Sequence, residues 1–440
     1  MPHDSSLPWI AELGFVVAAS SASDARRVGT HDVVTIPAHE FLQSIVVEAS
    51  SEGSWTATVE LFDAQGEYLE NLILSTRGTR RFLFRWGWDN GNGLDGNPQF
   101  LGGINTYVPK FTPEGVGISL QMTFDKALDA VLDRRIRSYP EGTKPSKIAT
   151  DIARERGWLG SDFATAPTIE TDDKPITFPL SWSGQSDLFI LNELVGPRIN
   201  TVTSKGKAYS WYFDTSGALH FHSAAFVNQK PAKSYRYARD ASGDVISFEP
   251  EEANISAAML GGGEAIWKGS NSNAGTRQED KTTGDKAPKG ATIVSQDDAT
   301  HRPDLGVGTK ASILVPSRDK ASFEAAVQAQ FDRMRNTLVK ANMTVVGTHE
   351  VRVGEYVEVV CTTKSGLSHY LAGKYRVNKL KQNLNSGGWT TDFELQRPGH
   401  QYADNAIKTN ADSTEHIEVE TASPTSSASA AINTEHRIRK

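Results

Sequence analysis

The sequence is poor in cysteine, and this scarcity excludes several kinds of site. Its 440 residues contain one cysteine, Cys361, so neither an internal disulfide framework nor a zinc site with several cysteine ligands is available. Cys361 lies in the strand-like segment 358–362, which matches no reactive-thiol signature. We therefore expect a buried structural thiol in a protein made in a reducing cytosol.

Long apolar runs and a surplus of basic residues are also absent. No uncharged apolar run approaches the roughly 20 residues of a membrane-spanning helix. Residues 1–4 are polar and acidic, unlike a secretory signal. We therefore expect no membrane insertion. The net charge of −7 argues against nucleic-acid binding by bulk charge, because phosphate contacts need clustered Lys and Arg.

The composition that remains favours β-structure. The length predicts roughly two to four domains, and the 38% hydrophobic and 9% aromatic content is typical of β-rich domains with one wet face or large subunit interfaces. Turn signals spaced about ten residues apart favour a small sandwich or barrel in the first part of the chain. The predicted strands there are 32–37, 42–47, 55–62, 69–75, 81–88 and 117–122. Residues 1–30 are expected to form an N-terminal arm.

Helical periodicity follows in the next part of the chain. Segments 124–132 and 186–195 have apolar residues at spacings of three and four. Between them a helix is predicted with Thr143 as its cap, Pro145 in its first turn and Gly157 as its C-terminal stop. Further β-structure is predicted as a hairpin at 209–222 and strands at 234–237 and 244–249.

Three local patterns are candidate binding sites. Loop 89–97 resembles a calcium loop, but glycines replace ligand positions and no glutamate closes it, so an ordinary hairpin loop is the alternative. His220 and His222 share one strand face, which suits either the start of a metal site or solvated or interface histidines. Glycines 261–263 lack the Lys-Ser or Lys-Thr that a phosphate loop needs. We expect no metal and no cofactor.

The C-terminal part predicts one long helix, one hairpin and two polar segments. An apolar stripe predicts a helix over 321–341. Segment 365–400 reads as a hairpin closed by a glycine turn, with no nucleophile–base pair. Segment 268–300 is expected to be a mobile insertion, and segment 401–440 a flexible tail.

The order of these pieces resembles the baseplate hub, or late control protein D, family of phage tails and related injection systems. Four motifs carry the resemblance: Arg-Trp-Gly-Trp at 85–88 followed by F-L-G-G-I at 100–104, the helix at 143–157, the hairpin at 211–221, and the C-terminal set 321–341, 353–357, 373–377 and 388–397. The match covers about 40–400. Each motif is weak alone, and their shared order is more specific.

The resemblance implies a β-rich α+β fold with two tube-type β-barrel or sandwich domains and an inserted helical/β middle domain. The first tube-type domain is expected at 31–125, the middle domain at 126–222, and the second tube-type domain at 223–267 and 301–400. The candidate structural and interface residues are Trp86, Gly87, Gly102, Gly217, Gly354, Gly373, Tyr375, Gly388, Trp389 and Arg397.

The resemblance also implies a function and partners. It suggests a homotrimeric hub in the tail baseplate or tip of the virion, made in the host cytoplasm. The expected partners are the tail tube protein, the central spike protein, the tape measure protein and other baseplate proteins. DNA is expected to pass without specific binding, because an acidic lumen repels phosphate. Gly388→Val or Trp389→Asp is expected to disrupt assembly rather than a catalytic rate.

Two other functions remain open at this point. A tail-associated cell-wall hydrolase needs paired carboxylates, a Cys–His pair or a metal constellation, and the sequence offers none that can be recognised. A carbohydrate-binding tail tip protein is suggested by nine Trp, but these are scattered among different elements. The sequence therefore favours a structural protein without enzymatic activity.

Overall fold

The fold was analysed in a computed structural model of the chain. The structure describes residues 9–17, 26–28, 31–51, 53–75, 81–88, 94, 99–158, 169–196, 198–214, 217–226, 230–237, 243–252, 263–268, 291–293, 311–316, 329, 333, 336–337, 339–361 and 371–397.

Strands dominate these residues. They are β1 (Trp9–Val17), β2 (Arg26–Val28), β3 (His31–Ile36), β4 (Leu42–Ser50), β5 (Thr56–Asp63), β6 (Arg81–Trp88), β7 (Gln99–Thr112), β8 (Gly115–Phe124), β9 (Arg135–Tyr139), β10 (Leu180–Gln185), β11 (Tyr209–Phe213), β12 (Leu219–Ser223), β13 (Lys233–Tyr237), β14 (Val245–Glu252), β15 (Gly263–Lys268), β16 (Ala291–Ile293), β17 (Ala311–Pro316), β18 (Val339–Val346), β19 (Tyr356–Cys361), β20 (Gly373–Asn385) and β21 (Gly388–Arg397). The helices are α1 (Ala38–Phe41), α2 (Tyr68–Ser75), α3 (Asp125–Leu132), α4 (Pro145–Arg156) and α5 (Asp187–Val195).

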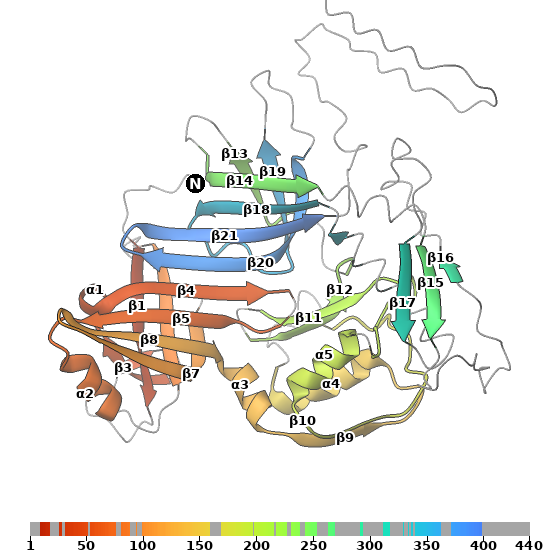
Figure 1. Ribbon diagram of the computed structural model, residues 1–440, viewed down its shortest axis with the longest axis horizontal. Coiled ribbons are helices and arrows are strands. Elements are labelled where there is room, and N and C mark those ends of the chain that lie inside the picture. Colours follow the sequence, from red (N-terminus) through yellow and green to blue (C-terminus); the bar gives the residue numbers. More distant parts are fainter. Residues whose placement is uncertain are drawn as a thin grey trace, which may run out of the picture.

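One 14-stranded sheet organises the molecule. Eight of its strands lie in the order β14-β18-β21-β20-β4-β5-β8-β7, and Figure 1 shows them stacked from top to bottom. The neighbouring pairs in this run are all antiparallel. Beyond β7 the sheet continues through β6, β1, β3 and β2. The expected β-rich fold class is confirmed at this level, with few helices and a large antiparallel sheet.

The eight strands form two equivalent halves. We call β4 to β8 the N-terminal unit and β14 with β18 to β21 the C-terminal unit. The N-terminal unit contributes β4-β5-β8-β7 to the run, and the C-terminal unit contributes β14-β18-β21-β20. In both units the last two strands therefore lie in the reverse of their order along the chain. The remaining strand also corresponds, because β6 pairs with the beginning of β7 as β19 pairs with the beginning of β20. The units are joined by β20 of one against β4 of the other.

Register shifts in the strand ladders occur at the same places in both units, so individual residues of one unit can be matched to residues of the other. The register shifts between Ile104 and Thr106 in β7 and between Val377 and Lys379 in β20. Seven residues later both strands enter a two-residue turn, which ends at Gly115 in one unit and Gly388 in the other. Matching shifts also occur between Leu42 and Ser44 in β4 and between Val245 and Ser247 in β14. Since β-bulges occupy defined places, the two units share one architecture in detail.

A cluster of aromatic side chains packs the units together. The ring centroid of His349 lies 5.1 Å from that of Trp86 and 4.7 Å from that of Trp389. His349 Nε2 donates to the carbonyl oxygen of Trp86 at 2.8 Å. Trp88 Nε1 donates to the carbonyl of Gly347 at 2.8 Å, and its ring lies 5.2 Å from that of Trp389. The junction therefore has a core as well as a backbone ladder.

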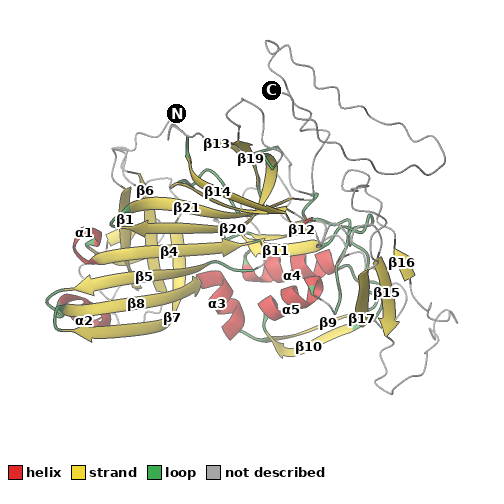
Figure 2. Cartoon of the chain, turned by 45° about the horizontal axis from the view of Figure 1, so that its top comes forward, coloured by secondary structure: helices red, strands yellow, loops and turns green. Residues whose placement is uncertain are grey.

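The middle region, from α3 to β12, sits beside the N-terminal unit (Figure 2). Its helices α4 and α5 and strand β9 meet at the buried carboxylate of Asp187. Arg137 Nε donates to it at 2.7 Å and Arg156 Nε at 2.6 Å. Burial lowers the pKa of Arg137, but its hydrogen bonds to Asp187 and Glu155 outweigh burial and leave the pKa raised. Such a pairing of buried charges ties three elements into one body.

Several sequence predictions are wrong at this level. The predicted strand 69–75 is helix α2, whose first N–H groups, those of Tyr68 and Leu69, donate to the Asp63 carboxylate at 2.9 and 3.1 Å. The predicted helix over 321–341 ends too late, because Val339–Val346 is strand β18, held between β14 and β21. Residues 329, 333 and 336 are helical, and 321–328 lie outside the described residues.

Smaller corrections concern the chain start, a helix cap and the cysteine. The first strand begins at Trp9, not near residue 32, and pairs with β6 and β3, so residues 9–17 are not an arm. Lys144, not Thr143, is the N-cap of α4, since the Thr143 hydroxyl donates to the Pro140 carbonyl at 2.7 Å. Cys361 is half-buried at the end of β19 rather than buried.

The predicted flexible tail and the predicted mobile insertion remain predictions for most of their residues. The tail 401–440 and most of 268–300 lie outside the described residues, although Ala291–Ile293 pairs with β15 as a strand. Helix α4 does begin at Pro145 and end at Gly157, whose φ of 66° is left-handed, as predicted. No helix in the described part of the chain is long and apolar enough to cross a membrane.

Candidate assembly surface

Strict alternation gives the eight-strand run one apolar and one polar face. In β21 the buried positions are Trp389, Thr391, Phe393, Leu395 and Arg397, and the residues between them are more exposed. The same alternation runs through β4, β5, β8, β18 and the second half of β20. Because the ladder registers align the strands, the intervening side chains share one surface, which we call the polar face.

The polar face carries charges of both signs. Its ionic residues are the carboxylates Glu48, Glu60, Glu249, Glu251, Asp392 and Glu394 and the lysines Lys110, Lys340, Lys379 and Lys381. Between them stand mostly Ser, Thr, Asn and Gln. The face thus carries two more acids than bases, and it is not the Lys/Arg-lined surface that would capture phosphate.

Hydrogen bonds and ion pairs hold the charged groups of this face in place. Lys379 Nζ lies 3.4 Å from a Glu48 carboxylate oxygen and 3.6 Å from one of Glu394. Burial lowers the pKa of Lys379, but these two carboxylates outweigh burial and leave it raised. Asp392 accepts hydrogen bonds from Thr344 at 2.8 Å and Asn383 at 2.7 Å. The charged groups around the β20–β4 junction are therefore paired with neighbouring polar groups.

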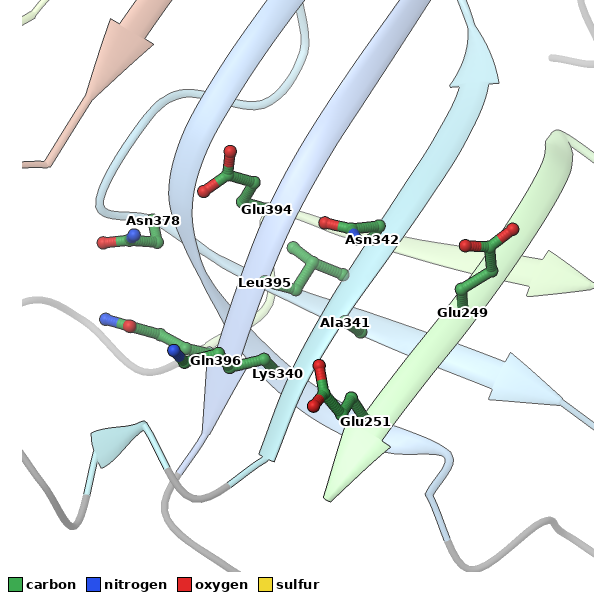
Figure 3. Close-up of a pocket in the computed structure, with 9 residues that line it drawn as sticks. All are labelled: Glu249, Glu251, Lys340, Ala341, Asn342, Asn378, Glu394, Leu395 and Gln396. Carbon is green, nitrogen blue, oxygen red and sulfur yellow. The ribbon is translucent and has the colours of Figure 1, made fainter. Parts of the chain in front are cut away.

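A shallow groove of about 160 Å³ lies at the β14 end of the polar face (Figure 3). Figure 3 shows Glu249 and Glu251 from β14, with Lys340 and Asn342 from the next strand and Glu394 from β21. Glu249 is opposite Asn342, and Glu251 is opposite Lys340. This arrangement offers polar contacts along a strand edge.

The two strands that end the eight-strand run expose apolar side chains. On β7, Tyr107 is 38%, Val108 46% and Phe111 69% exposed. On β14, Ile246 is 56% exposed. In the described residues, β14 pairs only with β18, and the second half of β7 pairs only with β8. Open edges with apolar side chains are interaction surfaces by default.

Most of the residues predicted as structural or interface candidates lie in the interior of the chain. Trp86 and Trp389 belong to the aromatic cluster and are 2% and 3% exposed. Trp389 Nε1 donates to Gln382 Oε1 at 2.6 Å. Gly87, next to Trp86 in β6, is opposite Ile10. Trp389→Asp would therefore act on folding before it acts on assembly.

Tyr375 and Arg397 form a second interior pair. The Arg397 guanidinium lies 4.8 Å from the centre of the Tyr375 ring, and its Nη1 donates to the carbonyl of Ala372 at 2.8 Å. Gly373, at the start of β20, has a φ of 127°. The pair fixes the end of β21 against the beginning of β20, inside one chain.

The remaining glycine candidates are needed for close approach or for turns. A Cβ on Gly102 would lie 2.5 Å from the Phe100 ring. Gly354 has φ +85°, and a Cβ there would lie 2.4 Å from the Tyr212 hydroxyl. Gly217 (φ +75°) turns the β11–β12 hairpin, and Gly388 (φ +128°) has open space around it. Of these candidates, Gly388 alone stands at a turn of the eight-strand run.

The two histidines of β12 are structural in this arrangement. His222 is 1% exposed, its Nδ1 is 2.8 Å from the Ser223 carbonyl, and its Nε2 is 3.3 Å from the Tyr212 hydroxyl. Burial lowers the pKa of His222 to about 3. His220 Nε2 is 3.1 Å from Asp214. In the described part of the chain, no three His, Cys, Asp or Glu side chains gather as metal ligands would.

Two of the candidate patterns lie mostly outside the described residues and remain predictions. Loop 89–97 is described only at Leu94, and glycines 261 and 262 lie outside the described residues. The open edges were missed by sequence reasoning. A signal was present in 105–112, where aromatic and polar residues alternate around Pro109, because a proline within such a pattern marks an edge strand.

Two solved structures share the fold over most of the chain. The 43 kDa tail protein of prophage MuSo2 from Shewanella oneidensis has a TM-score of 0.54 at 13% identity, covering 89% of this chain and 98% of that protein. The tail protein from Neisseria meningitidis has a TM-score of 0.53 at 11% identity, covering 90% and 99%. No family model and no curated protein matches the sequence. The resemblance to phage tail proteins is thus confirmed for the fold.

Proposed function

We propose that the chain is a structural hub protein of a phage tail. It forms a homotrimer in the baseplate or tip and joins the hexameric tail tube to the trimeric central spike. Its fold, shared with two phage tail proteins, supports this role. Its partners are the tail tube protein, the spike protein, the tape measure protein and other baseplate proteins, and it has no enzymatic activity of its own.

The observation that carries this proposal is the duplication of the eight-strand run. Each chain holds two units with the same strand order and the same bulges. Three copies present six equivalent units, which matches a sixfold tube on one side while the trimer matches a threefold spike on the other. A single chain thereby reconciles two symmetries.

In this proposal the N-terminal unit is the core of the expected tube-type domain at 31–125, which also takes in β1. The C-terminal unit lies within the expected second tube-type domain at 223–267 and 301–400, although β15 and β17 of those ranges pair in a separate three-stranded sheet with β16. Residues 126–222 form the middle domain between them. The ladder shared by β20 and β4 makes the two domains parts of one sheet, so they act as one wall segment of the ring.

The polar face lines the channel through the ring in this proposal. Its acids outnumber its lysines, and the lysines near the junction are already paired with Glu48 and Glu394. DNA leaving the virion therefore meets a wall that repels phosphate weakly and offers few unpaired cations.

The mass of the purified chain at micromolar concentration tests the proposal. Sedimentation equilibrium is expected to give three times the chain mass of 47.9 kDa, alone or together with a spike protein. A monodisperse monomer that does not bind the spike protein would overturn the proposal. Clearing of peptidoglycan in a gel assay would overturn its non-enzymatic part.

A further inference from the structure

The geometry points to a specific seam between copies of the chain. We propose that β7 of one copy lies antiparallel beside β14 of the next, in the register of the β20–β4 junction within each chain. This inference rests on the proposed trimer and adds to it the strands and residues that meet.

The strand order of the two units selects these partners. The junction inside the chain pairs β20 of the C-terminal unit with β4 of the N-terminal unit. The strand that corresponds to β20 in the N-terminal unit is β7, and the strand that corresponds to β4 in the C-terminal unit is β14. Both stand at the open ends of the eight-strand run. A contact between them is head-to-tail, and a head-to-tail contact closes into a ring when its rotation is a whole fraction of a turn, which is one third for the proposed trimer.

The matching bulges fix the register of the seam. Asn105 corresponds to Asn378 and Thr112 to Asn385, while Ser44 corresponds to Ser247. Within the chain, Lys381 is opposite Glu48, and Leu384 is opposite Ile45. Transferring these pairs sets Val108 opposite Glu251, Lys110 opposite Glu249, and Phe111 opposite Phe248.

The side chains at the open edges suit this register. Leu384 and Ile45 are both 0% exposed in the junction, whereas Phe111 at the position of Leu384 is 69% exposed. Phe248 is half-buried against Tyr375, at 5.9 Å between ring centroids, and provides the apolar surface that Phe111 would cover. On the polar face, Lys110 would meet Glu249 at the place where the junction has Asn383 opposite Val46. The junction has its own lysine–glutamate pair two residues away, where Lys381 Nζ lies 3.7 Å from Glu48.

Prolines make the seam differ from the junction in one respect. In an antiparallel sheet, successive residues of a strand direct their backbone N–H and C=O groups to opposite neighbours. The phase of this alternation is set by two hydrogen bonds, from the Phe124 N–H to the Trp55 carbonyl and from the Gly347 N–H to the Trp389 carbonyl. It follows that the backbone nitrogens of Pro109 in β7 and Pro250 in β14 point toward the open edges. In the proposed register these prolines are opposite each other. They remove the central hydrogen-bonded pair, and side chains must therefore carry more of the contact. Edge prolines also prevent pairing with unrelated strands.

Cysteine cross-linking tests the seam in the full-length chain. In a Cys361→Ser background, Val108→Cys and Glu251→Cys are introduced together, because directly opposed, non-hydrogen-bonded pairs have Cα atoms about 4.5 Å apart, within disulfide reach. Mild oxidation is expected to give covalent dimers and trimers on a non-reducing gel. Mixing a chain carrying only V108C with one carrying only E251C is expected to give dimers.

Matched controls separate the possible failures. The corresponding pair inside the chain, Lys381→Cys with Glu48→Cys, is expected to form an intrachain disulfide without change of mass. The shifted pair Thr112→Cys with Glu251→Cys is expected not to cross-link. A trimer by mass whose V108C/E251C pair stays reduced, while the internal pair closes, overturns the seam and leaves the hub proposal standing. A monomer by mass overturns the hub proposal itself. Equal cross-linking of the shifted pair overturns the register.

Discussion

The junction between β20 and β4 and the open edges of β7 and β14 use the same strand positions with different side chains. Where the junction has Leu384 and Ile45, both fully buried, the edges have Phe111 and Phe248. Where the junction has Gln382 opposite Val47, a pair able to exchange backbone hydrogen bonds, the edges have prolines. The same strand arrangement therefore forms a paired, buried ladder at the β20–β4 junction and an open strand edge at β7 and at β14.

This difference separates a permanent contact from one that must form during assembly. A sealed ladder inside one chain needs no protection, because its partner is always present. An open ladder risks pairing with any exposed strand, and a proline or a charge on the edge reduces that risk. The edges keep large apolar side chains, so selectivity comes from side-chain fit and charge rather than from the backbone alone.

An aspartate at the same position in the junction and at the edge should produce the largest contrast. Leu384→Asp buries a charge in the junction core and should lower the free energy of unfolding by about 4 kcal/mol or more. Phe111→Asp changes an exposed side chain and should alter that free energy by less than about 1 kcal/mol, yet abolish the trimer. Denaturant unfolding and sedimentation measure the two effects.

The two variants control for each other, since they make the same kind of change at corresponding positions. If Phe111→Asp remains trimeric, β7 is not at the subunit seam. If Leu384→Asp folds as stably as the unchanged chain, the buried junction does not hold the two units together in solution.

Acid should weaken the junction while leaving the edges intact. Burial lowers the pKa of His349 to about 4, and its hydrogen bond to the Trp86 carbonyl opposes burial only in part. Because the unfolded value is about 6.5, the stability that His349 contributes is present above pH 6.5 and is lost as pH falls from there toward 4. Between pH 7 and 5 the loss should be about 2 kcal/mol.

Thermal unfolding of His349→Gln across the same pH range isolates this effect. The variant keeps an N–H donor but cannot titrate, so its loss of stability between pH 7 and 5 should be smaller by about 2 kcal/mol. His222, whose pKa is lowered to about 3 by burial, accounts for part of the remainder. The edge segments 105–112 and 246–251 contain no histidine. An unchanged pH profile in His349→Gln would contradict the buried, neutral state of His349.

Local signals predicted the strands and turns well where pattern and pairing agree. Arg81–Trp88 forms a strand with the predicted bounds, and Gly388 closes the predicted hairpin. The prediction failed at 69–75, where a short apolar run suits either a strand or a helix. Asp63 decides the outcome there by capping the first turn, and its hydrogen bonds depend on the fold around it.

The duplication could not be read from the sequence because few corresponding residues are alike. Asn105 matches Asn378 and Gly115 matches Gly388, but Tyr107 corresponds to Leu380 and Pro109 to Gln382. Only the bulges and turns, which are properties of pairing, make the correspondence visible. The structural and the interface candidates could not be told apart for a related reason, since Trp86 and Trp389 signal burial without saying whether the neighbour belongs to the same chain.

The smallest expected effect sharpens the comparison most, because it tests one pair on the polar face. Lys110→Glu places like charges opposite each other in the proposed seam and should raise the dissociation constant of the trimer about three- to tenfold at low salt, in line with about 1 kcal/mol for such pairs. Adding Glu249→Lys in the same chain should restore most of the affinity, and 0.5 M salt should reduce both changes.

Sedimentation over a concentration series measures the dissociation constants. The reversal Lys381→Glu, at the lysine–glutamate pair of the junction two residues from the corresponding position, serves as the control, since it should change stability by less than about 1 kcal/mol and leave the dissociation constant unaltered. If the double variant stays as weak as Lys110→Glu alone, the two residues do not meet, and the register transferred from the junction is wrong.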